Sequence, residues 1–319
     1  MSLKKKYMKT SSLRCLFLVV VTILPLLSAT AQQQAMFTQY MFNQSILNPA
    51  YAASQDNLNA MLLARTQWFG LGGGPRTQTF SIHGPLSEKK FTAGLSFLND
   101  KISVVNSTET YADFAYQFQL VPDVYLALGL KAGFDFYQAD LTKLKTINNN
   151  DPSFSEDVNN SFLPNFGFGG FVYSNDYYLG VSVPKLSRNK ININSKVNSN
   201  TLSREELHYY IIGGYVFELD KDVKFKPSFF AKMVKGSPLS FDVNASFLLK
   251  EKLWLGGTYR LKEGFCANVE FKVTNNLMLG YSFDFTTSDL SSYNYGTHEV
   301  FVSLDLNFTR FRVKSPRYF

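Results

Sequence analysis

Short segments in which apolar and polar residues alternate restrict the fold of this chain more than any other feature. The clearest is Ser240–Leu249, where the odd-numbered residues are apolar and Asp242, Asn244 and Ser246 lie between them. A period of two is that of a β-strand with two different faces. In a soluble β-sandwich the apolar face is buried, whereas in a membrane barrel it faces lipid, so alternation alone leaves both open. The pattern recurs at Phe265–Val273, Leu277–Phe285 and Val300–Phe308.

The lengths of the connections separate these two alternatives. Every second connection is a tight turn, whereas the intervening ones include the three longest, at about 138–161, 185–206 and 287–297. Short turns on one side, long loops on the other and an even strand number are typical of an outer-membrane barrel with its short turns in the periplasm. We predict an all-β, antiparallel transmembrane barrel with long extracellular loops and about fourteen strands. These are about 59–70, 77–84, 90–99, 109–120, 123–137, 162–174, 176–183, 207–218, 222–234, 237–249, 252–261, 264–274, 276–287 and 297–308.

Residues 1–31 have the three parts of a secretory signal peptide. A basic stretch, a short apolar stretch from Cys15 to Leu27 and the small residues Ala29 and Ala31 follow in order. The apolar stretch is shorter than the roughly 20 residues that a membrane-spanning helix needs. We therefore expect cleavage after about Ala31 and export to the cell outer membrane.

Cleavage changes what the charge of the chain implies. The formal charge of the whole chain is +7, but the signal peptide contains five cations and no acids, which leaves +2. This predicts no nucleic-acid partner. The one remaining cysteine, Cys266, cannot form an intramolecular disulfide. Aromatic residues make up 16% of the chain, which suits a barrel in contact with outer-membrane lipid better than a soluble secreted β-protein.

The residue patterns that support chemistry predict no catalytic, cofactor-binding or metal site. The three histidines lie far apart in sequence, and the glycines at 70–74 lead into another strand rather than a helix. Polar residues on the predicted strands instead suggest a lumen in which opposite charges pair, or one that is polar because it is wet. They include Asp113, Asp242, Arg260, Glu270 and Asp284.

The stretch Gln39–Gly74 differs from the rest of the chain. It opens with an aromatic and amide-rich run and turns at Pro49, which disfavours a helical conformation at Asn48. We divide the chain into the signal peptide, residues 32–58 as a periplasmic or lumenal segment and candidate plug, and residues 59–319 as the barrel. Tyr40, Phe42 and Tyr51 are expected to pack against the inner wall or the mouth of the barrel.

The same stretch resembles the PorP/SprF family, outer-membrane proteins of the type IX secretion and gliding-motility apparatus of Bacteroidota. Two further segments also match the family, Ser81–Leu86 and the terminal Ser315–Phe319. The residues that carry the resemblance most specifically are Gln39, Tyr40, Asn43, Asn48, Pro49, Ala50, Tyr51, Arg65, Gln67 and Trp68.

The resemblance implies a non-enzymatic role in exporting large secreted adhesins, or other type IX substrates, or in anchoring them at the surface. It also implies periplasmic peptidoglycan-binding and secretion-ring proteins as partners. The alternative from another class is an outer-membrane pore for small solutes. If a secreted partner binds the long loops, the candidate contacts are apolar in the first loop and basic in the second. They are Leu141, Leu144, Ile147, Arg188, Lys190 and Lys196.

Overall fold

The computed structural model describes residues 35–87, 90–144, 156–192 and 202–306. Its main element is one antiparallel sheet of fifteen strand segments that closes on itself. Each strand pairs with its neighbours in sequence, and the first, β1, pairs with the last, β17. The strands are β1 Leu58–Thr66, β2 Arg76–Ser87, β3 Phe91–Ile102, β4 Val105–Val121, β5 Val124–Ala139, β6 Val158–Tyr173, β7 Tyr177–Val183, β10 His208–Tyr215, β11 Phe217–Asp220, β12 Val223–Val234, β13 Ser240–Leu249, β14 Leu253–Arg260, β15 Gly264–Lys272, β16 Leu277–Thr286 and β17 Thr297–Leu306.

The strands β10 and β11 are two parts of one strand, so the barrel has fourteen, as the sequence predicts. Both parts pair with β12, and Val216 between them donates its N–H to the Asp176 carbonyl at 2.7 Å. Pro227 of β12 lies opposite the break, between the partners of Gly214 and Phe217. Proline cannot donate a ladder hydrogen bond, which accounts for the interruption.

The two faces of the barrel answer the question that alternation left open. In β13 the side chains of Asp242, Asn244 and Ser246 are fully buried in the interior, whereas Val243 and Phe247 are 46% and 41% exposed on the outside. A polar inside and an apolar outside are the reverse of a soluble β-protein and are those of an outer-membrane barrel. Among the described residues, no helix is long and apolar enough to cross a membrane.

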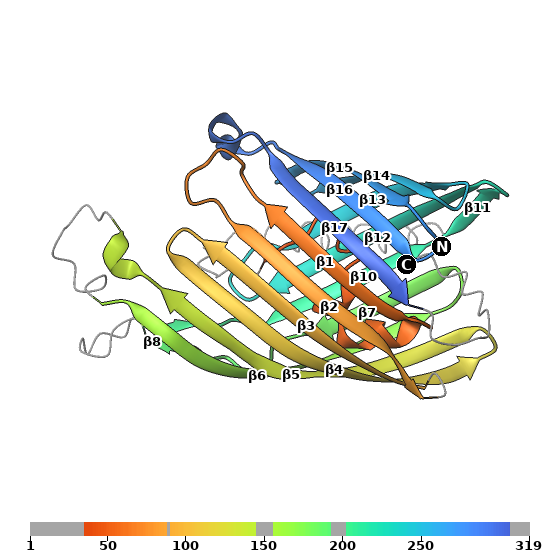
Figure 1. Cartoon of the computed structure of the whole chain (residues 1–319), viewed down its shortest axis with the longest axis horizontal. Coiled ribbons are helices and arrows are strands. Elements are labelled where there is room, and N and C mark those ends of the chain that lie inside the picture. Colours follow the sequence, from red (N-terminus) through yellow and green to blue (C-terminus); the bar gives the residue numbers. More distant parts are fainter. Residues whose placement is uncertain (1–34, 88–89, 145–155, 193–201, 307–319) are drawn as a thin grey trace, which may run out of the picture.

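The two ends of the barrel differ in their connections, as expected (Figure 1). One end, here called the short-turn end, has the tight β2–β3, β4–β5, β6–β7, β11–β12, β13–β14 and β15–β16 turns. The other, the long-loop end, has the connections at 67–75, 140–157, 184–207 and 287–296. These include the short helices η3 Leu141–Lys143 and η5 Asp289–Tyr293 and a separate hairpin of β8 Lys190–Asn192 with β9 Leu202–Arg204.

Three details depart from the sequence prediction. The first strand ends at Thr66 rather than at 70, because Trp68 has a positive φ of 53° and turns the chain. The predicted loop at 100–108 is a tight hairpin, since β3 and β4 pair as far as Ile102 and Val105. Ser103, with φ also at 53°, allows this two-residue turn. The β8–β9 hairpin was not predicted, because its strands are only three residues long.

The interior of the barrel holds the segment that precedes β1. It contains the single helical turn α2 Gln44–Leu47 and the 3₁₀ helix η2 Pro49–Ser54. Residues 35–54, called the lumenal segment below, lie within the ring of strands (Figure 1). Its apolar side chains form the main buried cluster together with inward-facing residues such as Met61, Leu63 and Phe301.

Candidate functional site

The aromatic side chains of the lumenal segment pack on the inner wall. Tyr40, which is 1% exposed, stacks on a β12 ring, and Tyr51 contacts one ring on β2 and one on β6. Such ring pairs contribute roughly 0.5–1.5 kcal/mol each beyond the area that they bury. The ring-centroid distances are 4.9 Å for Tyr40–Phe230, 6.2 Å for Phe42–Trp254, 5.6 Å for Phe42–Phe301, 5.9 Å for Tyr51–His83 and 5.6 Å for Tyr51–Phe171.

The fold of the lumenal segment follows from Asn48 and Pro49. Asn48 is extended (φ −139°, ψ 110°), as expected for a residue before proline, and it ends α2. Its side-chain oxygen accepts the Ala50 N–H at 3.0 Å, so it also caps η2, with Pro49 at the first helical position. The Asn48 side-chain amide donates to the carbonyl of Gly170 at 3.1 Å. One residue thus ends one helix, begins the next and ties both to β6.

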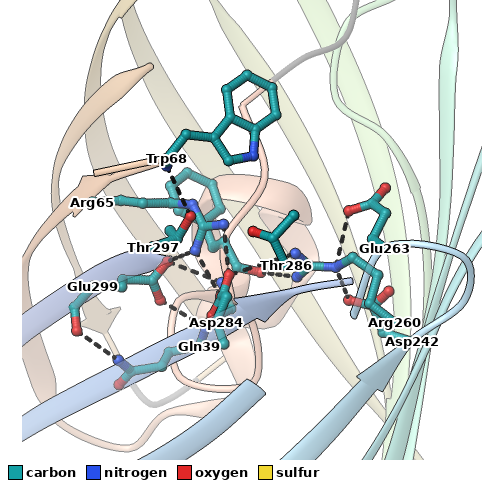
Figure 2. Close-up of polar contacts among 12 residues, drawn as sticks. Gln39, Arg65, Trp68, Asp242, Arg260, Glu263, Asp284, Thr286, Thr297 and Glu299 are labelled. Atoms are coloured by element: carbon teal, nitrogen blue, oxygen red, sulfur yellow. Dashed lines mark hydrogen bonds and ion pairs between the residues drawn. The ribbon is translucent and has the colours of Figure 1, made fainter. Parts of the chain in front are cut away.

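Charged side chains of the wall hold the first part of the lumenal segment. Glu299 of β17 accepts the N–H groups of Thr38 and Gln39, at 2.9 and 2.7 Å. The Thr38 hydroxyl donates to Asp284 of β16 at 2.6 Å and accepts from Arg65 of β1, also at 2.6 Å. Arg65 in turn forms ion pairs with Asp284 at 2.7 Å and with Glu299 at 3.0 Å (Figure 2).

Arg260 of β14 extends this cluster. Its Nε donates to Asp242 at 3.0 Å (Figure 2), and its Nη2 donates to the Phe37 carbonyl at 3.4 Å. We call Arg65, Arg260, Asp242, Asp284 and Glu299 the charged clamp. Each of these side chains is at most one-tenth exposed. Buried charges are tolerated only when they are paired, so the clamp and the segment that it holds depend on one another.

A second cation holds the lumenal segment from another part of the wall. Lys131 of β5 donates to the carbonyls of Ser45 and Ile46, at 3.5 and 3.2 Å, and pairs with Asp113 at 3.4 Å. These carbonyls belong to the single turn α2, whose last carbonyl groups have no partner within the helix. Ser182 of β7 similarly donates to the Leu47 carbonyl at 2.7 Å.

Glycines on the wall give the second part of the lumenal segment its space. A Cβ atom at Gly129 would lie 2.3 Å from the Ala50 nitrogen, and one at Gly169 would lie 2.0 Å from the Asn48 side-chain oxygen. A Cβ at Gly180 would lie 3.0 Å from the Asn48 side-chain nitrogen. We call Gly129, Gly169 and Gly180, on β5, β6 and β7, the glycine cradle. Only residues without a side chain let the wall approach the Pro49–Ala50 backbone and the Asn48 side chain so closely.

A cavity lies above the clamp at the long-loop end. Its volume is about 440 Å³, and we call it the vestibule. Ala35 and Met36 form part of its lining, so the lumenal segment begins at the long-loop end and runs towards β1 at the short-turn end. Other lining residues are Arg65, Gln67, Trp68, Arg260, Glu263, Cys266, Asp284 and Thr297.

The ten residues that carry the family resemblance lie on the lumenal segment or in the wall of the vestibule. Seven of them lie on the lumenal segment and are buried, including Asn43, which donates to Thr79 at 3.1 Å. Arg65 lies in the clamp, and Gln67 and Trp68 line the vestibule. The alternation pattern places Lys131, Arg260, Asp242 and Asp284 in the lumen, but the sequence analysis identified neither Glu299 nor the glycine cradle. In the described ranges, no three His, Cys, Asp or Glu side chains are grouped so as to hold a metal ion.

The candidate partner contacts on the long loops differ in how exposed they are. Leu141 is only 9% exposed because it packs with Ala139, Val158 and Leu163, so the expectation that it is available to a partner is wrong. Leu144 is partly buried against the same cluster, and Arg188 is exposed. Ile147 and Lys196 lie outside the described residues, as does the side chain of Lys190.

Lys185, at the start of the second loop, is not a free surface cation. It forms ion pairs with Glu109 at 2.7 Å and with Asp135 at 2.8 Å. Burial alone would lower the pKa of Lys185, but these two carboxylates raise it above its usual value. The ion pairs fasten the base of this loop to β4 and β5.

Comparison with solved structures finds weak likeness to bacterial outer-membrane proteins. A FadL homologue of Pseudomonas aeruginosa is 10% identical, with a TM-score of 0.48, covering 83% of this chain and 94% of that one. The toluene transporter TodX of Pseudomonas putida is 8% identical, with a TM-score of 0.49 and coverage of 88% and 96%. Omp33 of Acinetobacter baumannii is 8% identical, with a TM-score of 0.46 and coverage of 80% and 100%.

No curated protein matches the sequence. The model of one protein family does match, over residues 29–304, and its description is "Type IX secretion system membrane protein PorP/SprF". The matched range contains the lumenal segment, the clamp, the glycine cradle and nearly all of the barrel. The chain therefore belongs to the PorP/SprF family of type IX secretion system membrane proteins.

Proposed function

We propose that this protein is a non-enzymatic component of the type IX secretion and gliding-motility system. In this role it supports the export or the surface anchoring of a large secreted adhesin through its long-loop end. The observation that carries the proposal is the filled lumen, since residues 35–54 occupy the interior and are held from several sides of the wall. A barrel filled in this way acts through the surfaces at its ends rather than through an open channel.

The difference between the two ends supports an assignment of partners. The long-loop end has the chain length needed to contact a secreted protein, and by the general rule for such barrels it faces outward. The short turns then face the periplasm, where the peptidoglycan-binding and secretion-ring proteins implied by the family resemblance would contact them.

The test is to replace each long loop with a short Gly-Ser turn. The loops are residues 140–157 and 184–207. We expect each replacement to reduce the amount of adhesin at the cell surface, with the barrel itself still in the outer membrane. Replacing residues 235–239, at the same end of the barrel, is the matched control. Normal surface display after both long-loop replacements would contradict the proposal.

A pore for small solutes is the second candidate function. The vestibule favours it, because a cavity of about 440 Å³ with mixed polar and apolar walls can admit a small molecule from the long-loop end. Conductance in planar bilayers separates the two functions. The leading proposal expects low conductance from the full chain and a steady open state only after residues 32–58 are deleted. A steady open state of the full chain would favour the pore.

A further inference from the structure

The clamp contacts the lumenal segment in the way that a binding site contacts a peptide. The two carboxylate oxygens of Glu299 each accept one of two successive backbone N–H groups, those of Thr38 and Gln39. Arg260 donates to the carbonyl of the preceding residue, Phe37. Every polypeptide has these backbone groups. Because two successive N–H groups reach the same carboxylate, the main chain is bent at Thr38. This part of the clamp therefore recognises a bent main chain rather than one particular sequence.

Selectivity comes from one side chain. The Thr38 hydroxyl donates to Asp284 and accepts from Arg65, each at 2.6 Å. A serine or threonine can do both at once, whereas an apolar residue would leave a buried carboxylate and a buried guanidinium short of a partner. The position occupied by Thr38 is therefore specific for a hydroxyl group.

The vestibule gives a second segment access to this site. Arg65, Arg260 and Asp284 belong both to the clamp and to the vestibule wall. Arg65 is 3% exposed, yet its Nε has no hydrogen-bond partner, so the clamp has donor capacity that the lumenal segment does not use. Arg260 Nη1 is also 3.7 Å from Asp284, beyond a hydrogen bond.

We propose that the charged clamp is a recognition site for a polypeptide segment that bends at a central serine or threonine. In the resting protein, Phe37–Gln39 occupies this site in cis. A segment of the secreted partner enters through the vestibule and exchanges with it. The exchange rests on the proposed function, because it takes the secreted protein as the source of the competing segment. The recognition site itself does not depend on which partner is served.

The experiment measures binding of a fluorescent peptide, AMFTQYM, to the full-length protein in detergent. This peptide copies residues 35–41. The variant Thr38→Val weakens the cis contact, so we expect it to bind the peptide at least about tenfold more tightly than the wild type or Thr38→Ser does. The double variant Thr38→Val/Glu299→Gln should not bind AMFTQYM more tightly than the wild type does. Thr38→Val should likewise not bind the control peptide AMFVQYM more tightly. Equal binding in all these combinations overturns the proposal.

A second measurement needs no variant, in case Thr38→Val does not fold. The amides of Thr38 and Gln39 are protected from hydrogen exchange by Glu299. Excess AMFTQYM should accelerate their exchange in the wild-type protein, and AMFVQYM should not. No acceleration at the highest soluble concentration overturns the proposal. Neither measurement uses an adhesin, so failure here is distinguishable from failure of the loop-replacement test.

Discussion

The two parts of the lumenal segment are held by opposite kinds of contact. Phe37–Gln39 is held by hydrogen bonds and buried charges of the clamp, on β1, β13, β14, β16 and β17. Asn48–Tyr51 instead lies against the glycine cradle, where fit depends on the absence of side chains. Hydrogen bonds can be transferred to another peptide, whereas a close steric fit accepts only the shape that it was made for. The first part is thus suited to exchange and the second to permanent attachment.

The largest effect should come from removing a charge from the clamp. Glu299→Gln leaves Arg65 with one carboxylate instead of two, in a site where the Arg65 and Glu299 side chains are 2% and 0% exposed. Breaking a buried ion pair costs about 3–5 kcal/mol. We expect a loss of that size in the free energy of unfolding, measured by denaturant titration of the purified barrel in detergent.

Glu263→Gln is the control for this prediction. Glu263 is half-exposed and lies 3.7 Å from Arg260, so its replacement should change stability by less than about 1 kcal/mol. Equal losses for Glu299→Gln and Glu263→Gln would contradict the view that the clamp holds the segment through buried charge.

The cradle should respond to added volume rather than to lost charge. Gly129→Ala places a methyl group against the backbone of Pro49 and Ala50, and such overpacking costs about 1–3 kcal/mol. We also expect faster protease cleavage within residues 48–54. The matched control is Gly257→Ala, where the nearest atom would be 3.7 Å away. If both variants behave alike, the cradle is not a close fit.

A smaller effect should separate the two roles of Asn48. Asn48→Ala loses the cap of η2 and the bond to Gly170, and cap removal alone costs about 1 kcal/mol. Asn48→Asp also loses the donor to the wall but keeps an acceptor for the Ala50 N–H. The melting temperature of Asn48→Ala should therefore be lower than that of Asn48→Asp. The reverse order would mean that burying a carboxylate against the Gly170 carbonyl costs more than losing the cap.

The smallest effect should be the coupling energy between a variant of the clamp and a variant of the glycine cradle. The clamp and Gly129 share no wall strand, and independent sites add within about 0.5 kcal/mol. The double variant Glu299→Gln/Gly129→Ala should therefore lose the sum of the two single losses in the denaturant titration. A larger coupling energy would show that residues 35–54 are held as one rigid unit, and the contrast between their two parts would disappear.

The sequence was sufficient to predict the barrel because its signals are local. The alternation of apolar and polar residues marks the strands, and turn residues such as Pro122 and Asp220 mark the tight connections. These patterns are the same whether the apolar face of a strand meets lipid or a protein core. They therefore predicted the fourteen strands of the barrel correctly. They misplaced some strand ends, for example at Trp68 and near Ser103, where positive φ angles begin the turns, and they missed the short β8–β9 hairpin.

The site was less predictable because its contacts are distant in sequence. Arg65 is 219 residues from Asp284 and 234 from Glu299, so nothing near Arg65 indicates its partners. Leu141 looked like an exposed anchor for the same reason, because Val158 and Leu163, which cover it, lie beyond the loop. The aromatic run beginning at Gln39 did indicate a packed segment, since its side chains are too apolar to lie in water.

The pairing of β1 with β17 constrains how this molecule assembles. Leu58 pairs with Leu306. This seam between the first and the last strand therefore joins the residues of the sheet that are farthest apart in sequence. Contacts between residues so far apart in sequence form slowly. The lumenal segment precedes β1 and yet touches β14, β16 and β17, which are synthesised last. If the seam closed first, twenty residues would have to thread through a finished ring, so the strands must wrap around the segment while the sheet is still open.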